Sequence, residues 1–351
     1  MKKKINILLL GVGGNVTQGI LAVLNQKRQD YNIIGACISE ESLGLYMCDE
    51  AYISPYANDK NFLNWVIDLC NDKNIDIIFS GVEEVIYELC KNLEKIKEKT
   101  NSIFICSSLE KLNIGNDKLK TCMWLEKNGL NYPKYADGSL NEDIYKLIEE
   151  VGYPIIAKPK KGKGSQGIFI LNNEDDLKNI KEKEEYVFQE LLGTPDDEYT
   201  VACYMSKEEK IQDIIIMKRK LKYGTTFAAE IIKNPLIYNE AKKICELFRP
   251  KGPLNIQMRM HKGKAICFEL NVRFSGTTPL RARWGYNDVE AILKEYIYNE
   301  SIENFLKPYE EGKVYRYFNE LFIDLNLEKD LKKYGHSIEN KQYLSFEERR
   351  K

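Results

Sequence analysis

A carboxylate, two carboxamides and a guanidinium lie close together near residues 255–273 and could do phosphate chemistry. Glu269, Asn271 and Arg273 are spaced two residues apart, as are strand side chains that share a face, and Gln257 precedes them on another apolar run. Mg²⁺ prefers hard oxygen donors and usually shares its coordination shell with substrate phosphates. A guanidinium beside such a site could hold a transferring phosphoryl group. The same pattern also fits the solvent-facing side of an amphipathic strand.

Two predicted strands position these side chains. The segments Leu254–Met260 and Ala265–Val272 are joined by the polar residues His261–Lys264, which fits a hairpin whose turn contains a glycine. Asn255 and Gln257 would share one face of the first strand. The sequence therefore predicts a polar sheet face to which both strands contribute.

Two lysines upstream are candidates for binding phosphates. One predicted strand ends at Lys158 and a proline, and it leads into the glycine- and lysine-rich loop 160–167. Glycines let backbone N–H groups approach phosphates, and lysines offset their charge. The loop lies between strands and lacks the P-loop spacing. Lys118 follows the helix-start signal Asn116-Asp117. The alternatives are a basic surface turn for the loop and a solvated helix residue for Lys118.

The ordered series Asn255-x-Gln257 and Glu269-x-Asn271-x-Arg273 resembles the ATP-grasp superfamily, particularly the synthetase repeats of the carbamoyl phosphate synthetase large subunit. Val272 departs from the family, which usually has proline there. The resemblance implies that Gln257, Glu269 and Asn271 hold Mg²⁺ or Mn²⁺ between the phosphates of ATP. It implies catalytic roles for Arg273 and Lys158. The ATP-binding residues that it implies are Lys118, Lys158, Gly162, Gly164, Ser165, Glu190, Leu192 and Glu198.

The resemblance also interprets the segment after the predicted strand that begins at Tyr186. Similar proteins bind adenine at this hinge between two subdomains, so Glu190 and Leu192 are expected to contact adenine. Glu198, eight positions after Glu190, is expected to bind a ribose hydroxyl. Without the family, residues 196–198 would be interpreted as a polar loop.

The N-terminal third alternates strands and helices, which favours a parallel sheet of doubly wound type. The strand Ile5–Leu10 runs into Gly11-Val12-Gly13-Gly14 and then an apolar helix. A dinucleotide fingerprint requires a third glycine where Val16 stands, although Glu40 or Glu41 could serve as the ribose acid. A nicotinamide-dependent oxidoreductase is therefore one alternative. In the resembling family this turn belongs to a Rossmann-like domain that does not bind NAD.

Three further residues are candidates for binding the substrate. Glu83 or Glu84 follows a predicted strand at the edge where α/β sheets bind ligands, and similar ligases place an acid there. The alternative is that both are first-turn acids that favour the helix dipole. Ser275 and Arg281 could bind a carboxylate.

Composition sets broad limits on partners and compartment. The 52 basic and 53 acidic residues give a net charge of −1, so no global field favours nucleic acid or an anionic membrane. Nine cysteines without C-x-x-C spacing suggest buried, reduced thiols in the cytosol. No apolar run is long enough for a signal peptide or a membrane span. No Ser-His-Asp or Cys-His nucleophile set is visible.

We therefore expect a mixed α/β and α+β enzyme, a Rossmann-like domain followed by a two-lobed ATP-grasp domain. The expected domains are 1–110 (Rossmann-like), 111–187 (small lobe with the glycine-rich lid), 188–312 (large lobe with the metal site) and 313–351 (C-terminal extension). The expected reaction is ATP-dependent activation of a carboxylate as an acyl phosphate, followed by attack of an amine or ammonia. A non-catalytic ATP-binding protein is the other alternative. We expect a cytoplasmic protein with small-molecule partners, and a homodimer remains open.

Overall fold

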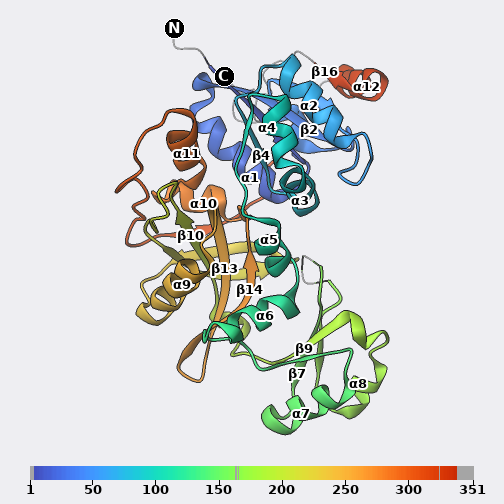
Figure 1. The fold of residues 1–351 in the computed structure, drawn as a ribbon, viewed down its shortest axis with the longest axis vertical. Coiled ribbons are helices and arrows are strands. Elements are labelled where there is room, and N and C mark those ends of the chain that lie inside the picture. Colours follow the sequence, from blue (N-terminus) through green and yellow to red (C-terminus); the bar gives the residue numbers. More distant parts are fainter. Residues whose placement is uncertain (1–3, 163, 165, 324, 338–351) are drawn as a thin grey trace. The chain divides into compact units, whose positions relative to one another are not determined.

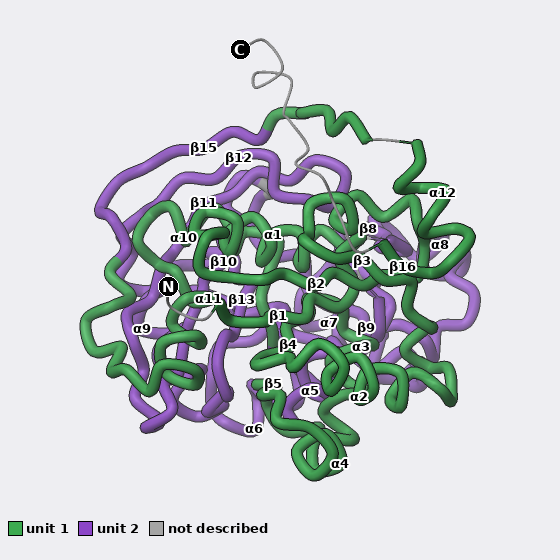
Figure 2. Tube along the Cα trace, turned by 90° about the horizontal axis from the view of Figure 1, so that it is seen from above, with its two compact units in different colours: residues 1–109, 273–307, 317–351 green, residues 110–272, 308–316 purple. Residues whose placement is uncertain are grey.

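The chain forms two compact units within the residues that the computed structural model describes, 4–162, 164, 166–323 and 325–337. Unit 1 comprises Met1–Leu109, Arg273–Lys307 and Tyr317–Lys351, and unit 2 comprises Glu110–Val272 and Pro308–Arg316 (Figure 2). Unit 1 first ends at Leu109, and residues 273–307 belong to unit 1 as well. The expected domain limits stay a prediction.

Unit 1 is built on a six-stranded sheet in the order β16-β3-β2-β1-β4-β5 (Figure 1). Strands β1 to β5 pair in parallel with their neighbours, and β16 pairs antiparallel with β3. The strands are β1 (Ile5–Leu10), β2 (Tyr31–Cys37), β3 (Glu50–Ile53), β4 (Ile77–Ser80), β5 (Ile103–Phe104) and β16 (His336–Ser337). The helices are α1 (Asn15–Leu24), α2 (Phe62–Asp72), α3 (Glu83–Lys91), α4 (Leu93–Lys99), α10 (Thr278–Arg283), α11 (Asp288–Ile292) and α12 (Leu325–Tyr334), with short helical turns η1 (Asn25–Asp30), η2 (Leu43–Met47) and η5 (Leu293–Ile297).

The central strand of this sheet consists largely of buried apolar residues. Four consecutive residues of β1, from Ile7 to Leu10, are fully buried, as expected for a parallel strand covered on both faces. Two separate helices, α3 and α4, follow β4 and are divided at Asn92. The Asn92 side-chain amide donates to the backbone oxygen of Glu88 at 3.0 Å and to its carboxylate at 2.8 Å. This local bonding competes with continued helix.

Unit 2 contains two antiparallel sheets. The four-stranded sheet has the order β6-β9-β7-β8, and the six-stranded sheet has the order β14-β13-β10-β11-β12-β15. The smaller one comprises β6 (Tyr135–Asp137), β7 (Ile155–Pro159), β8 (Phe169–Leu171) and β9 (Tyr186–Glu190), and the larger one β10 (Glu198–Met205), β11 (Ile215–Lys222), β12 (Thr225–Ile231), β13 (Gly252–His261), β14 (Lys264–Asn271) and β15 (Lys313–Tyr315). The helical segments are α5 (Leu109–Gly115), which begins at the last residue of unit 1, α6 (Lys118–Lys127), α7 (Asn141–Val151), α8 (Glu174–Asn179), η3 (Lys183–Glu185), η4 (Pro195–Asp197) and α9 (Pro235–Phe248).

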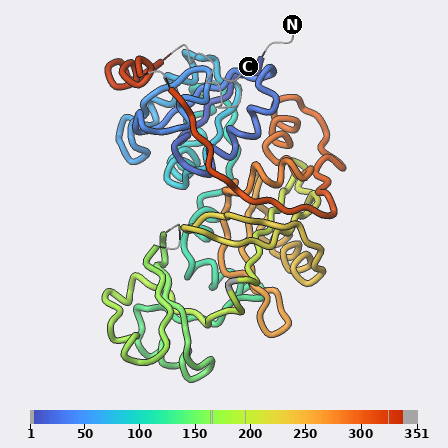
Figure 3. Tube along the Cα trace, turned by 180° about the vertical axis from the view of Figure 1, so that it is seen from behind, coloured from blue at the N-terminus to red at the C-terminus, as the bar shows by residue number. Residues whose placement is uncertain are grey.

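Two strands of the larger sheet have short neighbouring segments that pair little. β11 begins at Ile215, and Ile211 before it forms an isolated bridge to Met205. β15 pairs with β12. Residues 316–323, which follow it, form no helix or strand, and Figure 3 draws this part of the chain as an extended orange-red tube. The charged end 341–351, which we expect to fray, lies outside the described residues.

All nine cysteines have free thiols, eight of them buried and Cys90 half-buried, which agrees with the expected reduced thiols. Among the described residues, no helix is both long and apolar enough to cross a membrane.

Candidate active site

The β13–β14 hairpin brings the three expected metal ligands together. Gln257 lies directly opposite Glu269, and Asn255 lies opposite Asn271. The side-chain amides of Asn271 and Gln257 donate to the same carboxylate oxygen, Oε1 of Glu269, at 2.9 and 3.3 Å. The Asn255 side chain instead accepts the Thr200 hydroxyl at 2.8 Å and is buried. Gln257, Glu269 and Asn271 therefore gather on one polar face of the hairpin, and their role as metal ligands stays a prediction.

This donor set fits Mg²⁺ or Mn²⁺ by its chemistry. One carboxylate and two carboxamides offer only hard oxygen donors, once each amide is turned to present its oxygen. Within the described part of the chain, no three His, Cys, Asp or Glu side chains cluster as a metal site. With one carboxylate among the three ligands, a bound cation would take further oxygens from phosphates and water.

A β-bulge shapes the polar face. Gln257 pairs with Glu269 and Met258 pairs with Cys267, so Phe268 has no partner across the ladder. A bulge re-aims the side chains around it. The Phe268 ring accordingly contacts the site: the Lys158 Nζ lies 4.8 Å from the ring centroid and the Arg259 guanidinium carbon 5.8 Å.

Lys158 lies near the end of β7, and its ammonium group is in a poorly hydrated environment. Burial lowers the pKa of this lysine to about 8, although the nearby Glu269 acts in the opposite direction. Among the described residues Lys158 forms no ion pair. It is therefore a positive charge close to the carboxylate of the proposed metal site and available to an anionic ligand.

Lys118 begins α6, as predicted. The Asp117 side chain caps this helix by accepting from the backbone N–H groups of Leu119 and Lys120. The Lys118 Nζ donates to the Gly162 carbonyl at 3.0 Å, so it contacts the glycine-rich loop. Gly164 is described, whereas the expected phosphate ligand Ser165 lies outside the described residues.

Glu198 is buried between two arginines that sequence reasoning did not assign to the site. Its Oε1 accepts from Arg219 Nε and Nη2 at 3.0 and 2.7 Å, and its Oε2 accepts from Arg259 at 2.8 Å. Burial alone raises the pKa of the Glu198 carboxyl, but the two guanidinium groups outweigh it and lower the pKa below its ordinary value. Arg219 also donates to Gln257 Oε1 at 2.9 Å. The proposed ribose acid and the proposed metal site thus belong to one network.

A signal for one of these arginines was present in the sequence. Arg259 lies two residues after Gln257 on the same predicted strand and therefore on the same face. Arg219 gave no such signal, because its partners lie 21 and 38 residues away along the chain.

The expected adenine hinge has an apolar wall and a polar edge. Leu192, Ile266 and Phe268 form a small buried cluster. The Leu192 carbonyl accepts from Arg259 at 3.1 Å, and Glu190 Oε1 accepts from the backbone N–H of Lys134 at 2.9 Å. Apolar surface with a few placed backbone groups is typical of sites for flat heterocyclic ligands.

The remaining expected site residues belong to unit 1. β14 ends at Asn271, so strand alternation does not extend to Arg273 as predicted. The Arg273 guanidinium instead pairs with Glu83, with two hydrogen bonds at 3.1 and 2.5 Å. The pair is mostly buried, with 14 and 26% of the side chains exposed. The substrate role expected for Glu83 stays a prediction.

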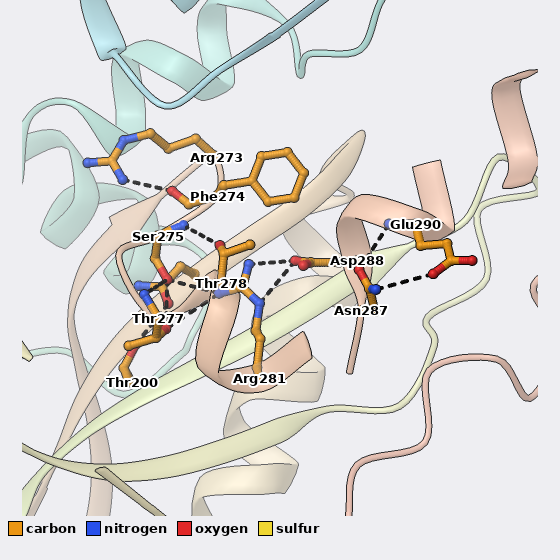
Figure 4. Close-up of polar contacts among 11 residues, drawn as sticks. Thr200, Arg273, Phe274, Ser275, Thr277, Thr278, Arg281, Asn287, Asp288 and Glu290 are labelled. Carbon is orange, nitrogen blue, oxygen red and sulfur yellow. Dashed lines mark hydrogen bonds and ion pairs between the residues drawn. The ribbon is translucent and has the colours of Figure 1, made fainter. Parts of the chain in front are cut away.

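Arg281 is enclosed by protein groups (Figure 4). Its guanidinium is 1% exposed, pairs with Asp288 at 2.5 Å and donates to the Ser275 hydroxyl at 2.9 Å. Ser275 also shares a hydrogen bond of 2.8 Å with Thr277. These contacts let Arg281 support the turn that carries Ser275, and direct contact of either residue with a substrate stays a prediction.

The N-terminal glycine turn is closely packed. A Cβ atom on Gly11 would lie 2.4 Å from a methyl carbon of Val82, and one on Gly81 would lie 2.4 Å from a methyl carbon of Val16. Val16 occupies the third-glycine position of the dinucleotide fingerprint, and its side chain packs on Gly81. These contacts favour a packing role for the glycines over pyrophosphate binding.

Two family models match the chain in the order that the fold displays. Residues 115–277 match the ATP-grasp domain, and residues 7–104 match the PylC-like N-terminal domain. The carbamoyl phosphate synthase large chain of Hyperthermus butylicus is 25% identical over 184 residues, which cover 46% of this chain and 17% of that protein. A D-alanine–D-alanine ligase of Bacillus anthracis is 25% identical over 142 residues, which cover 40% of this chain and 43% of the ligase. The chain therefore spans less than half the length of these relatives.

Solved structures share the fold over most of the chain. The ADP complex of N5-carboxyaminoimidazole synthetase from Staphylococcus aureus gives a TM-score of 0.71 at 18% identity and covers 95% of this chain and 87% of that one. The biotin carboxylase domain of the 2-oxoglutarate carboxylase of Hydrogenobacter thermophilus, in complex with MgADP and bicarbonate, gives a TM-score of 0.69 at 14% identity and covers 89% of this chain and 74% of that one.

The domain matches define the class: residues 115–277 belong to the ATP-grasp domain family, and the fold agrees with this match. The Rossmann-like first domain is of the PylC-like type. In sequence the chain is similar to part of the carbamoyl phosphate synthase large chain and to part of a D-alanine–D-alanine ligase.

Proposed function

We propose that the protein is an ATP-dependent ligase that activates a substrate carboxylate as an acyl phosphate for attack by an amine or ammonia. The observation that carries this proposal is the polar network of unit 2. Arg219 joins Glu198 to Gln257, and Gln257 bonds to Glu269. A ribose acid, a metal site and a buried lysine at one place suit a nucleoside triphosphate.

Each group has a distinct task in the proposed reaction. Lys118 and Lys158 would bind the phosphates, and Gln257, Glu269 and Asn271 would hold Mg²⁺ or Mn²⁺, which offsets phosphate charge when bound. A carboxylate oxygen attacks the γ-phosphorus, and the bond to the ADP oxygen breaks. The amine nitrogen then attacks the acyl carbon, phosphate leaves, and the nitrogen loses a proton. Arg273 would stabilise the charge on the transferring group.

The proposal extends to small-molecule carboxylate and amine substrates and to a cytoplasmic location. It includes no nucleic-acid or membrane partner. The domain limits expected from the sequence, with a glycine-rich lid at 162–167, are part of the same proposal.

The test is release of ADP and phosphate from Mg-ATP across a panel of carboxylic acids and amines. Glu269→Ala should abolish turnover because it removes the only carboxylate of the proposed metal site. Glu246→Ala, on an exposed position of α9, is the matched control and should leave turnover unchanged. Equal turnover of wild type and Glu269→Ala would contradict the proposed metal site.

Two other outcomes identify the alternatives. ATP binding without ADP release under any substrate pair would favour a non-catalytic nucleotide-binding protein. NADH or NADPH binding without a need for Mg-ATP would favour the oxidoreductase, against which the crowding of Gly11 and Gly81 already argues.

A further inference from the structure

Three consecutive residues at the end of β13 contact the expected adenine hinge. Arg259 donates to the Leu192 carbonyl at 3.1 Å. The Met260 carbonyl lies so close to Gly193 that a Cβ atom there would be 2.6 Å from its oxygen. The backbone N–H of Gly193 donates to His261 Nδ1 at 3.1 Å. The hinge is therefore held in place from the strand that also carries Gln257.

The hydrogen bond from Gly193 determines the state of the imidazole. A ring nitrogen that accepts an N–H carries no proton, so the neutral His261 ring has its proton on Nε2. Nε2 is buried, lies 3.4 Å from Glu190 Oε2 and has no hydrogen-bond partner among the described residues. The ring is mostly enclosed, with 19% of the side chain exposed.

Charged groups surround this ring on the hinge side. Glu190 faces Nε2, and the Lys262 ammonium lies 3.9 Å from the same carboxylate oxygen. The Arg259 guanidinium lies at the Leu192 carbonyl, and its Nε is buried without a hydrogen-bond partner among the described residues. Lys264 pairs with His261 across the hairpin.

We infer that His261 is a positioning residue that holds the adenine-binding hinge only in its neutral form, so that its protonation weakens adenine binding. Protonated imidazole carries N–H groups at both nitrogens. Its Nδ1–H would then face the Gly193 N–H, two donors without an acceptor between them, while the Nε2–H remains beside Glu190. The hinge would lose the bond from Gly193 to His261 and would keep the bond from Arg259 to the Leu192 carbonyl. This inference rests on the proposed function, because it assigns adenine to this hinge.

The test compares binding of Mg-ATP and of inorganic tripolyphosphate at about pH 8 and about pH 5. The proteins are wild type, His261→Gln and His261→Leu, and calorimetry measures the dissociation constants. The glutamine oxygen can accept from Gly193 but does not titrate. Because the chain has two histidines, this variant separates His261 from His336.

Relative to His261→Gln, in which Lys158 titrates in the same way, we expect the ATP affinity of wild type to fall about threefold to tenfold from about pH 8 to about pH 5, as for loss of one neutral hydrogen bond. His261→Gln should bind ATP as wild type does at about pH 8 and should show none of this fall. His261→Leu should bind ATP about threefold to tenfold more weakly at both pH values. Tripolyphosphate lacks adenine, so its relative affinity for the three proteins should be the same at each pH.

Equal pH dependence in wild type and His261→Gln would overturn the inference, as would a parallel loss of tripolyphosphate binding in His261→Leu. Nitrogen-15 NMR of the nucleotide-free wild type adds an independent readout, and a proton on Nδ1 at about pH 8 would also overturn it. Absence of ATP binding in wild type would instead overturn the proposed function and the adenine role with it. If His261→Leu does not fold, the comparison of wild type with His261→Gln decides.

Discussion

Nucleotide binding should depend on the charge of Lys158. Burial lowers the pKa of its ammonium to about 8, so this residue titrates within an accessible pH range. Only the charged form can pair with phosphate oxygens, and bound phosphates favour that form. We therefore expect the dissociation constant of Mg-ATP to rise as the pH increases through 8.

The expected rise in the dissociation constant follows from the fraction of Lys158 side chains that are charged. With a pKa of about 8, roughly nine tenths of the Lys158 side chains are charged at about pH 7 and roughly one tenth at about pH 9. The dissociation constant should therefore rise about tenfold between these pH values. Lys158→Arg keeps its charge throughout this range and should show no such rise.

Calorimetric titration with Mg-ATP at intervals of about half a pH unit measures this dependence. An unchanged dissociation constant in wild type between about pH 7 and pH 9 would refute the reasoning, and so would the same rise in Lys158→Arg.

The same lowered pKa has a consequence for stability. The unfolded lysine keeps its proton up to about 10.5, whereas the folded one releases it above about 8. The free energy of unfolding should therefore increase between these pH values, because the unfolded chain binds more protons there. At about pH 7, Lys158→Met should stabilise the fold by about 2 kcal/mol, a value reduced from the full pKa difference because the residue keeps some exposure. Urea denaturation at about pH 7 checks this, and a less stable Met variant would contradict it.

Three further predictions concern buried groups. Glu198→Gln should lower the free energy of unfolding by about 2 to 4 kcal/mol in urea denaturation, because it leaves two guanidinium groups without their carboxylate. Gly193→Ala should destabilise more than Gly129→Ala, since both glycines have positive φ (+46° and +65°) but only Gly193 is crowded; equal thermal shifts would refute the close approach. Asp288→Asn should cost about 3 to 5 kcal/mol, and the double variant with Arg281→Met should recover part of it, which a thermal double-mutant cycle measures.

Local patterns were sufficient for the elements that carry the site. Side-chain alternation predicted the shared face of Gln257 and Glu269, and the strand-end proline placed Lys158 beside the glycine-rich loop. The Asp117 cap was visible as a helix-start signal. Each of these depends on neighbours along the chain, which is why the sequence alone could predict it.

Contacts between distant segments could not be found in this way. Arg219 and Glu198 are 21 residues apart, and His261 and Gly193 are 68 apart. No period or motif relates such positions. Residues 273–307 belong to unit 1, and β16 pairs with β3. Neither feature has a signal in the local sequence, because both join segments that are far apart along the chain.

The unpaired Phe268 is one extra residue that the hairpin takes up without changing the direction of its polar side chains. In a regular ladder that included Phe268, strict alternation would turn Ile266 and Glu269 to opposite sides, and the bulge keeps both on the side of Gln257. A chain without residue 268 could form a regular ladder in which Glu269 still lies opposite Gln257, so the bulge adds an aromatic ring to the site at no cost to the register. Position 268 is therefore a place where the nucleotide specificity of this scaffold can be redesigned without moving the proposed metal ligands.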